Sequence, residues 1–232
     1  MTNARCRIAT VAAGTALFVA SLFGPSPTPP AGASTGSGAV SFLLTLANGA
    51  VYDYGGAQYF GSPADHPLTR PIVGVTETAD AGGYWMVASD GGVFNYGDAG
   101  FFGSTGALAL NKPVVGLTPT PHGKGYWLVA SDGGIFTFGD AGYFGSTGAI
   151  RLNKPIVGMA ATKDGQGYWL VASDGGIFTF GDATFFGSTG AIRLNEPIVG
   201  MAATKDGGGY MMVASDGGVF TFGDSGFFGS PA

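Results

Sequence analysis

A segment of 42 residues recurs along this chain, and this period constrains the fold more than any other feature of the sequence. Residues 125–166 return at 167–208 with only four changes. Looser copies begin at residues 83 and 209, and residues 51–55 align with residues 93–97 one period later. A period in this range is typical of repeat architectures, in which each repeat is one supersecondary unit packed on its neighbours.

The N-terminus has the features of a secretory signal peptide. Arg5 and Arg7 form a positive segment, residues 8–23 are apolar and uncharged, and Ala31-Gly32-Ala33 offers small residues for cleavage. We expect residues 1–33 to be removed and residues 34–39 to be a linker. The alternative is an uncleaved anchor, but a membrane-spanning helix needs about 20 apolar residues. We therefore predict a secreted, extracellular protein without membrane insertion after cleavage, in a location compatible with cell-wall association.

The composition beyond residue 33 excludes several kinds of partner. The single cysteine, Cys6, lies in the predicted signal peptide, so neither disulfides nor cysteine–metal sites are expected. Eight basic and fifteen acidic residues remain, giving a net charge of −7, and no basic patch suggests nucleic acid as a partner. No cofactor motif is present, and no cofactor is expected. Despite 44 glycines, regularly spaced aromatic and β-branched residues favour a folded domain over disorder.

Each unit contains four short apolar runs separated by turn residues. In one unit the runs are residues 156–161, 168–173, 177–180 and 184–186. Asp174-Gly175 predicts a hairpin with a type I′ turn between the second and third runs. Four strands joined by tight turns would form one antiparallel sheet per unit.

Both faces of that sheet are apolar. Tyr168 and Leu170 share one face of their strand, and Trp169 and Val171 share the other. A sheet with one solvated face would alternate apolar with polar residues. Sheets buried on both faces, one per repeat, are typical of β-propeller blades. We therefore predict an all-β fold for residues 40–232, a five-bladed β-propeller built from four-stranded 42-residue repeats, with small residues such as Gly158 on the innermost strand. The predicted units are residues 40–62, 71–104, 113–146, 155–188 and 197–230.

The first of these units is incomplete, because no P[IV]VG strand precedes it. Three arrangements follow: one blade has three strands, the ring is open, or a neighbouring chain closes it and makes a dimer by strand donation. A β-solenoid of stacked hairpins is the competing architecture and needs no closure.

The motif GYW[LM]VASDGG[IV]F-x-[FY]GDA-x-[FY]FGSTG resembles a tandem repeat of secreted proteins from actinomycete-type bacteria. The resemblance covers about residues 40–230. In that family the repeat sometimes stands beside cell-wall hydrolase or protease domains, and no catalytic or ligand residues carry over. The order of elements in residues 168–188 and 197–200 is also similar to RCC1-type propellers, although the units here are shorter. That second similarity concerns the fold alone.

Repeated aromatic residues are the first candidates for ligand contact. The tryptophans could stack on sugar rings, with avidity compensating for weak single sites. In the middle of apolar strands they could equally be core, and Met211 replaces tryptophan in the last unit. The second aromatic of each pair near the predicted outer strand is the other candidate. The candidate ligand-binding residues are Trp85, Trp127, Trp169, Phe102, Phe144, Phe186 and Phe228.

Asp98, Asp140, Asp182 and Asp224 recur after a glycine in four units. If these turns face one end of the ring, their carboxylates could hold a hard cation. As turn residues they would instead cap their own backbone. Cation sites usually gather several carboxylates in one loop, so no metal is expected.

Catalytic motifs give little support for an enzyme, since no nucleophile elbow, HExxH or Walker loop is present. The alternative function is a glycosidase-like or other cell-wall hydrolase using Glu77 or Glu196, or an accessory domain derived from one. The leading hypothesis is a secreted, non-enzymatic binding or scaffold module at the cell surface. It would recognise cell-wall polysaccharide or another surface protein through repeated weak sites.

Overall fold

The computed structural model describes residues 42–54 and 57–230. The predicted signal peptide and linker lie outside these ranges. The described residues form fourteen strands and no helix, so no helix in them could cross a membrane. The strands are β1 (Phe42–Thr45), β2 (Val51–Tyr54), β3 (Ile72–Glu77), β4 (Gly83–Ala88), β5 (Val93–Gly97), β6 (Val114–Pro119), β7 (Gly125–Ala130), β8 (Ile135–Gly139), β9 (Ile156–Ala161), β10 (Gly167–Ala172), β11 (Ile177–Gly181), β12 (Ile198–Ala203), β13 (Gly209–Ala214) and β14 (Val219–Gly223).

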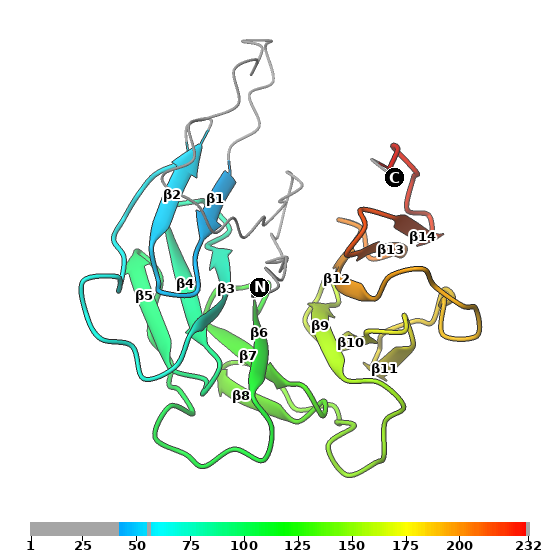
Figure 1. The fold of residues 1–232 in the computed structure, drawn as a ribbon, viewed down its shortest axis with the longest axis horizontal. Coiled ribbons are helices and arrows are strands. Elements are labelled where there is room, and N and C mark those ends of the chain that lie inside the picture. Colours follow the sequence, from blue (N-terminus) through cyan, green and yellow to red (C-terminus); the bar gives the residue numbers. More distant parts are fainter. Residues whose placement is uncertain (1–41, 55–56, 231–232) are drawn as a thin grey trace, which may run out of the picture.

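These strands form five antiparallel sheets, one from each predicted unit. The first sheet pairs β1 with β2, and each later sheet contains three consecutive strands, from β3–β4–β5 to β12–β13–β14. The sheets surround a common centre in chain order (Figure 1). Their first strands contact one another in the sequence β1, β3, β6, β9, β12. The fold is therefore a five-bladed β-propeller, and the solenoid alternative does not describe it.

The ring is open within the described residues. Neither β1 nor β2 contacts any strand of the β12–β14 sheet, and Figure 1 shows a gap between these two sheets. The described residues thus form an open ring, and closure by a neighbouring chain stays a prediction. Any strand before β1 would lie outside the described residues.

The small residues predicted for the innermost strand are confirmed. Gly158 lies in β9, which packs against β12. A Cβ atom on Gly158 would lie 3.3 Å from Val171 Cγ1 and 3.7 Å from the Cα of Gly200 on the neighbouring inner strand. Larger side chains at these positions would push the inner strands apart where the blades converge.

The prediction of a fourth strand in each unit is wrong. Residues 184–186 and their equivalents form no strand, and each complete blade has three. The backbone groups of this segment bond to side chains instead of a ladder. Trp169 Nε1 donates to the Thr184 carbonyl at 2.7 Å, and the Phe186 N–H donates to the Tyr210 hydroxyl at 3.2 Å. The segment is thus a linker that lies between one blade and the next.

The predicted type I′ turn is also wrong, although the hairpin itself is confirmed. Gly175 has φ +78°, but among the described residues Ala81 is the one non-glycine residue with positive φ, so Asp174 does not have it. The Gly175 N–H donates to the Ala172 carbonyl at 2.8 Å, and Asp174 Oδ1 accepts from the Gly176 N–H at 3.0 Å. This is a three-residue loop that ends in a left-handed glycine, stabilised by the aspartate side chain.

The core lies between the blades rather than inside any one of them. Trp85 of β4 packs edge-on against Tyr126 of β7, with ring centroids 6.1 Å apart. Trp127 contacts Tyr168 in the same way at 5.9 Å. Each three-stranded sheet therefore has two apolar faces, as its sequence pattern predicts.

Candidate binding surface

The linker after the third strand of each blade carries the predicted aromatic pair. Its second member, Phe102 in the first complete blade, is half-buried. The Phe102 ring lies 5.6 Å from the Tyr126 ring, and its N–H donates to the Tyr126 hydroxyl at 3.2 Å. The same contacts recur between Phe144 and Tyr168 and between Phe186 and Tyr210. Three of the four phenylalanines proposed as ligand contacts are thus placed between blades.

Phe228, the fourth of these phenylalanines, is 93% exposed. It occupies the same position in the repeat, after β14, but no sheet of the described chain follows it. Its exposure therefore reflects a missing neighbour and not a different local structure.

The tryptophan candidates are placed in the core. Trp85, Trp127 and Trp169 are each at most 1% exposed. Their Nε1–H groups donate to the carbonyls of Gly100, Gly142 and Thr184, all at 2.7 Å. Fully buried rings with satisfied donors offer no face on which a sugar could stack.

The first member of each aromatic pair is the one that faces solvent. These side chains, which we call the rim aromatics, are between 52% and 62% exposed. They are Tyr59, Phe101, Tyr143, Phe185 and Phe227. The sequence contains a signal for this: the first member is phenylalanine or tyrosine, whereas the second is phenylalanine in all five units. A hydroxyl is accommodated easily where water can reach it and costs free energy where water cannot.

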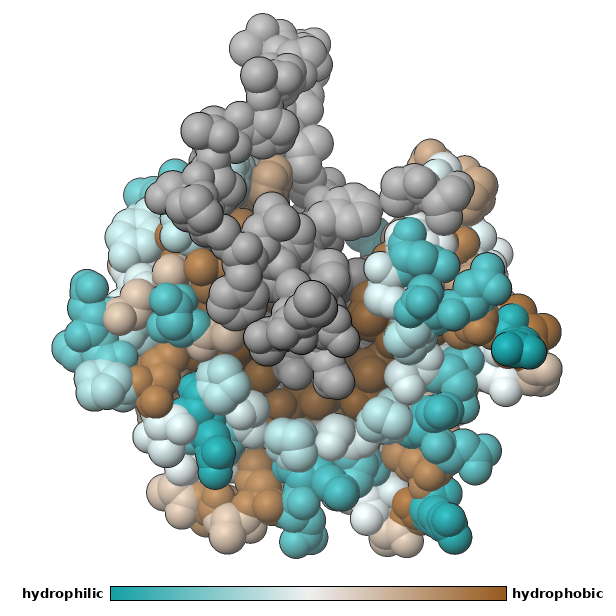
Figure 2. Space-filling model, in the orientation of Figure 1, coloured by the Kyte–Doolittle hydropathy of each residue, from teal (hydrophilic) through white to brown (hydrophobic). Residues whose placement is uncertain are grey.

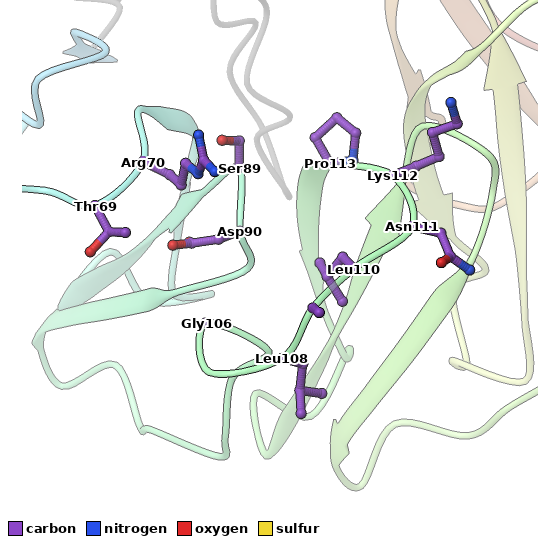
Figure 3. Close-up of a pocket in the computed structure, with 11 residues that line it drawn as sticks. Thr69, Arg70, Ser89, Asp90, Gly106, Leu108, Leu110, Asn111, Lys112 and Pro113 are labelled. Carbon is purple, nitrogen blue, oxygen red and sulfur yellow. The ribbon is translucent and has the colours of Figure 1, made fainter.

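A cleft of about 470 Å³ opens between the second and third blades (Figure 3). Arg70 and Asp90 line one side, and Leu108, Asn111 and Lys112 come from the loop on the other side. The lining therefore combines two cations, a carboxylate, an amide and an exposed apolar side chain. This lining is more polar than that of a typical small-molecule pocket, which is mostly apolar.

The positions that line this cleft recur one period later, with changes in charge. The pair Arg70 and Lys112 becomes Lys112 and Lys154 at the next blade junction, and then Lys154 and Glu196. Glu196 accepts a hydrogen bond from the Ser215 hydroxyl at 3.2 Å. The three junctions thus have similar linker sequences but differ in the charge of the residues at these positions.

The aspartates considered as cation ligands lie on the face of the ring opposite to this cleft, directly after the third strand of each complete blade. The Thr78 hydroxyl oxygen lies 3.0 Å from Asp98 Oδ1 and 3.0 Å from Asp80 Oδ1, so it can donate its one proton to either carboxylate. The carboxyls of Asp182 and Asp164 form an equivalent pair, and hydrogen bonding lowers the pKa of Asp164, chiefly through the Gln166 N–H. No group of three or more acidic, histidine or cysteine side chains suited to a metal occurs in the described ranges. The arrangement that is present caps turns through threonine.

Glu77 and Glu196 are not brought together. Glu77 ends the inner strand β3, whereas Glu196 precedes the inner strand β12. Because the inner strands occupy equivalent places in the repeat, one glutamate lies on one face of the ring and the other lies on the opposite face. Burial raises the pKa of Glu77, but no second carboxylate from this pair is available to it. Paired-carboxylate hydrolysis requires two acids flanking one bond.

Hydrophobic and hydrophilic residues are interspersed around the ring in the space-filling view (Figure 2). Exposed apolar side chains are distributed one or two to a unit, with Leu108, Ile150 and Ile192 as a second repeated set. The surface therefore offers several small, similar patches rather than one large patch.

No protein-family model matches this chain, and no curated protein matches its sequence. Among solved structures, the β-propeller domain of Cps50 (Swd1) from Myceliophteria thermophila is 11% identical, with 72% of this chain and 56% of that chain covered and a TM-score of 0.49. A structural-genomics protein of unknown function from Bacteroides thetaiotaomicron is 14% identical, with 80% and 54% covered and a TM-score of 0.48. The chain spans about half the length of these two structures. Likenesses at this level carry no argument about function.

Proposed function

We propose that this protein is a non-enzymatic binding or scaffold module that acts at the cell surface and recognises cell-wall polysaccharide through repeated weak sites. The observation that carries the proposal is the set of five rim aromatics, one in each unit at the same position. Repeated, equally presented rings suit a polymer whose own structure repeats.

The exposure of these rings is not required by the fold. The inter-blade contact is made by the neighbouring residue, as Phe102 shows, while Phe101 remains open to water. The position nevertheless holds an aromatic residue in every unit while changing between tyrosine and phenylalanine. Exposed aromatic side chains supply large contact areas to a partner at a low cost in side-chain entropy.

Several weak sites on one rigid ring convert later binding events into intramolecular ones. Linked sites can raise overall affinity by about 100-fold or more without any new type of contact. The cleft lined by Arg70 and Lys112 would add hydrogen bonds to hydroxyl or carboxylate groups of the polymer. This supports a polysaccharide over a single small molecule.

Retention on purified wall polysaccharide and binding to a glycan array test this proposal. The purified chain should be retained, and single changes such as Phe101→Ser should weaken retention slightly. The fourfold variant Phe101→Ser, Tyr143→Ser, Phe185→Ser, Phe227→Ser should lose retention by about 100-fold or more, because avidity is lost with the sites.

The matched comparison changes the second exposed set, Leu108→Ser, Ile150→Ser and Ile192→Ser, which is equally exposed but not aromatic. This variant keeps every rim aromatic and the polar groups of the cleft that Leu108 lines, so it should lose much less retention than the fourfold variant. Absence of retention on every glycan and wall fraction, or full retention by the fourfold variant, would refute the polysaccharide version. Retention on intact cells but not on purified polysaccharide would identify a surface protein as the partner.

A further inference from the structure

The cleft between the second and third blades is lined by two cationic side chains, Arg70 on one side and Lys112 on the other (Figure 3). Both are exposed, and within the described residues neither takes part in an ion pair or a side-chain hydrogen bond. The lining contains one carboxylate, Asp90, whose Oδ1 accepts the Gly92 N–H of its own hairpin turn at 2.9 Å. The cleft thus has two cations against one carboxylate, although the chain beyond residue 33 has a net charge of −7.

The walls of the cleft are connected by backbone hydrogen bonds. The Ser89 N–H donates to the Pro71 carbonyl, and the Val114 N–H donates to the Ser89 carbonyl, both at 2.9 Å. Pro71 follows Arg70 directly, and Val114 lies two residues after Lys112. The segments that carry the two cations are therefore held in place before a ligand binds, so little conformational freedom is lost on binding.

The last blade shows that a carboxylate is accommodated at this position of the repeat. Glu196 stands where Arg70 stands in the second blade, and Ser215 stands where Ser89 does. The Ser215 hydroxyl donates to Glu196 Oε2 at 3.2 Å. In the second blade the equivalent serine also lines the cleft, but its neighbour is cationic. A carboxylate supplied by a ligand can therefore accept hydrogen bonds from Ser89 and Arg70 together.

The cations recur at the cleft positions of the later junctions. Lys154 repeats the position of Lys112, while Arg151 and Arg193 repeat that of Ala109, which also lines the cleft. A polymer with regularly spaced negative charges would thus meet cations at more than one junction. Five of the eight basic residues beyond residue 33 lie at these positions, namely Arg70, Lys112, Arg151, Lys154 and Arg193.

We propose that this cleft binds an oxyanion of an acidic polysaccharide, a carboxylate or a phosphodiester, between Arg70 and Lys112. The proposal rests on the polysaccharide-binding function proposed above and names the chemical class of the polymer. The Arg70 guanidinium can hold an oxyanion with two parallel N–H groups, and the flexible Lys112 side chain supplies a second positive charge. The Asn111 amide can bind a neighbouring sugar hydroxyl. A neutral polymer has no group for the two charges, so the cleft discriminates by charge.

Polygalacturonate and its methyl ester test the proposal, because esterification removes the charge and keeps the sugar backbone. The unmodified chain should bind polygalacturonate about 10-fold or more tightly than the ester at low salt, and high salt should reduce this difference. Isothermal titration calorimetry measures both affinities. Poly(glycerol phosphate), titrated in the same way, distinguishes a phosphodiester from a carboxylate as the preferred anion.

The double variant Arg70→Gln, Lys112→Gln keeps hydrogen-bond donors but removes both charges, so it should lose the preference for the charged polymer. The matched control, Lys124→Gln, Lys163→Gln, removes the same charge from exposed turns on the opposite face and should keep the preference. Glu196→Lys adds a cation at the last junction and should tighten binding of the charged polymer by about fivefold, a gain that misfolding cannot produce.

Equal affinity for the charged and esterified polymers, an equal loss in the control variant, or binding to phosphatidylglycerol vesicles but to neither charged polymer would overturn the proposal. Retention on neutral wall polysaccharide that the double variant leaves unchanged would refute this inference and keep the proposed function. Charge-dependent binding that the double variant abolishes, without retention on any wall polysaccharide, would refute the cell-wall function and keep the anion site.

Discussion

At the scale of single residues, the tyrosine at the second position of the middle strand of each complete blade connects two units. Tyr126 sits in β7 and is fully buried, but its hydroxyl reaches the linker of the preceding unit. It accepts from the Phe102 N–H at 3.2 Å and donates to the Gly103 carbonyl at 2.5 Å. The hydroxyl thus satisfies backbone groups that a fourth strand would otherwise have paired.

Tyr126→Phe should destabilise the protein by about 1–3 kcal/mol, because the Phe102 N–H and the Gly103 carbonyl lose their partner while remaining partly buried. Urea unfolding measures the change. The control Tyr143→Phe removes a hydroxyl from an exposed ring and should stay within about 0.5 kcal/mol of the unmodified chain. Equal unfolding midpoints for both variants would contradict the role assigned to Tyr126.

The same tyrosines make stability sensitive to alkaline pH. Burial is the largest cause that raises the pKa of Tyr84, Tyr126, Tyr168 and Tyr210. The folded chain holds these phenols protonated more firmly than the unfolded chain does. Stability is therefore fully present below the usual tyrosine pKa of about 10 and decreases as the pH rises above it. The urea midpoint, measured against pH, should fall there together with the growth of tyrosinate absorbance, and Tyr126→Phe should make the fall less steep. A midpoint that is constant across this range would contradict the prediction.

Ala81 is strained where its equivalents are not. It has φ +58° in the turn between β3 and β4. The later units have glycine at this position, namely Gly123, Gly165 and Gly207, with φ between +64° and +81°. Ala81→Gly should stabilise the protein by about 0.5–1 kcal/mol, the left-handed penalty less the added freedom of glycine in the unfolded chain. Gly207→Ala, whose Cβ would meet only an ordinary contact at 3.6 Å, should show the opposite sign. Thermal unfolding of both variants compares them, and a destabilised Ala81→Gly would show that the strain is absent.

At the scale of elements, the strand positions could be predicted but the linkers could not. The run 156–161 matches β9, and 177–180 falls within β11, because alternation and turn residues act locally. The linker residues 184–186 are as apolar as a strand, yet they bond to side chains of two different blades. Those partners, Trp169 and Tyr210, are far from the linker in sequence, so no local pattern reveals them.

The hairpin turns depend on their glycines for space as well as for φ. Gly133 has φ +78°, and a Cβ there would lie 1.7 Å from Thr147 Oγ1. Gly133→Ala should therefore combine a conformational cost of about 1–2 kcal/mol with an overpacking cost of about 1–3 kcal/mol. Gly123 also has positive φ but has nothing within 4 Å of such a Cβ, so Gly123→Ala should show the conformational cost alone. Equal losses in urea unfolding would show that the neighbouring threonine moves aside freely.

At the scale of the whole molecule, blades contact their immediate neighbours along the ring and no others. Stability in such an array is close to a sum of unit and nearest-neighbour contributions. The β12–β14 blade has one neighbour in the described chain, whereas β9–β11 has two. Which member of each aromatic pair faces water was hard to predict for the same reason. Whether Phe101 or Phe102 faces water is decided by the following blade and not by the pair itself.

The β12–β14 blade should open before the internal blades. Backbone amides of β13 should exchange with solvent deuterium faster than those of β10, although the two strands differ little in sequence. Hydrogen exchange followed by mass spectrometry of peptides from each blade measures this, at a concentration where the chain is a monomer. Uniform protection in all blades would mean that the ring opens only as one cooperative unit.

An open ring also changes what a duplication does to the molecule. In a closed circle an extra repeat has no place, because every angle between blades must readjust before the first and last can meet. Here an added 42-residue copy would only lengthen an arc, meeting the same surfaces that its template meets. Each such event would contribute one more rim aromatic at the same spacing. Under the proposed function, the number of rim aromatics would therefore follow the number of repeats in the gene. Affinity for the polysaccharide would then change with repeat number, without any change within a single site.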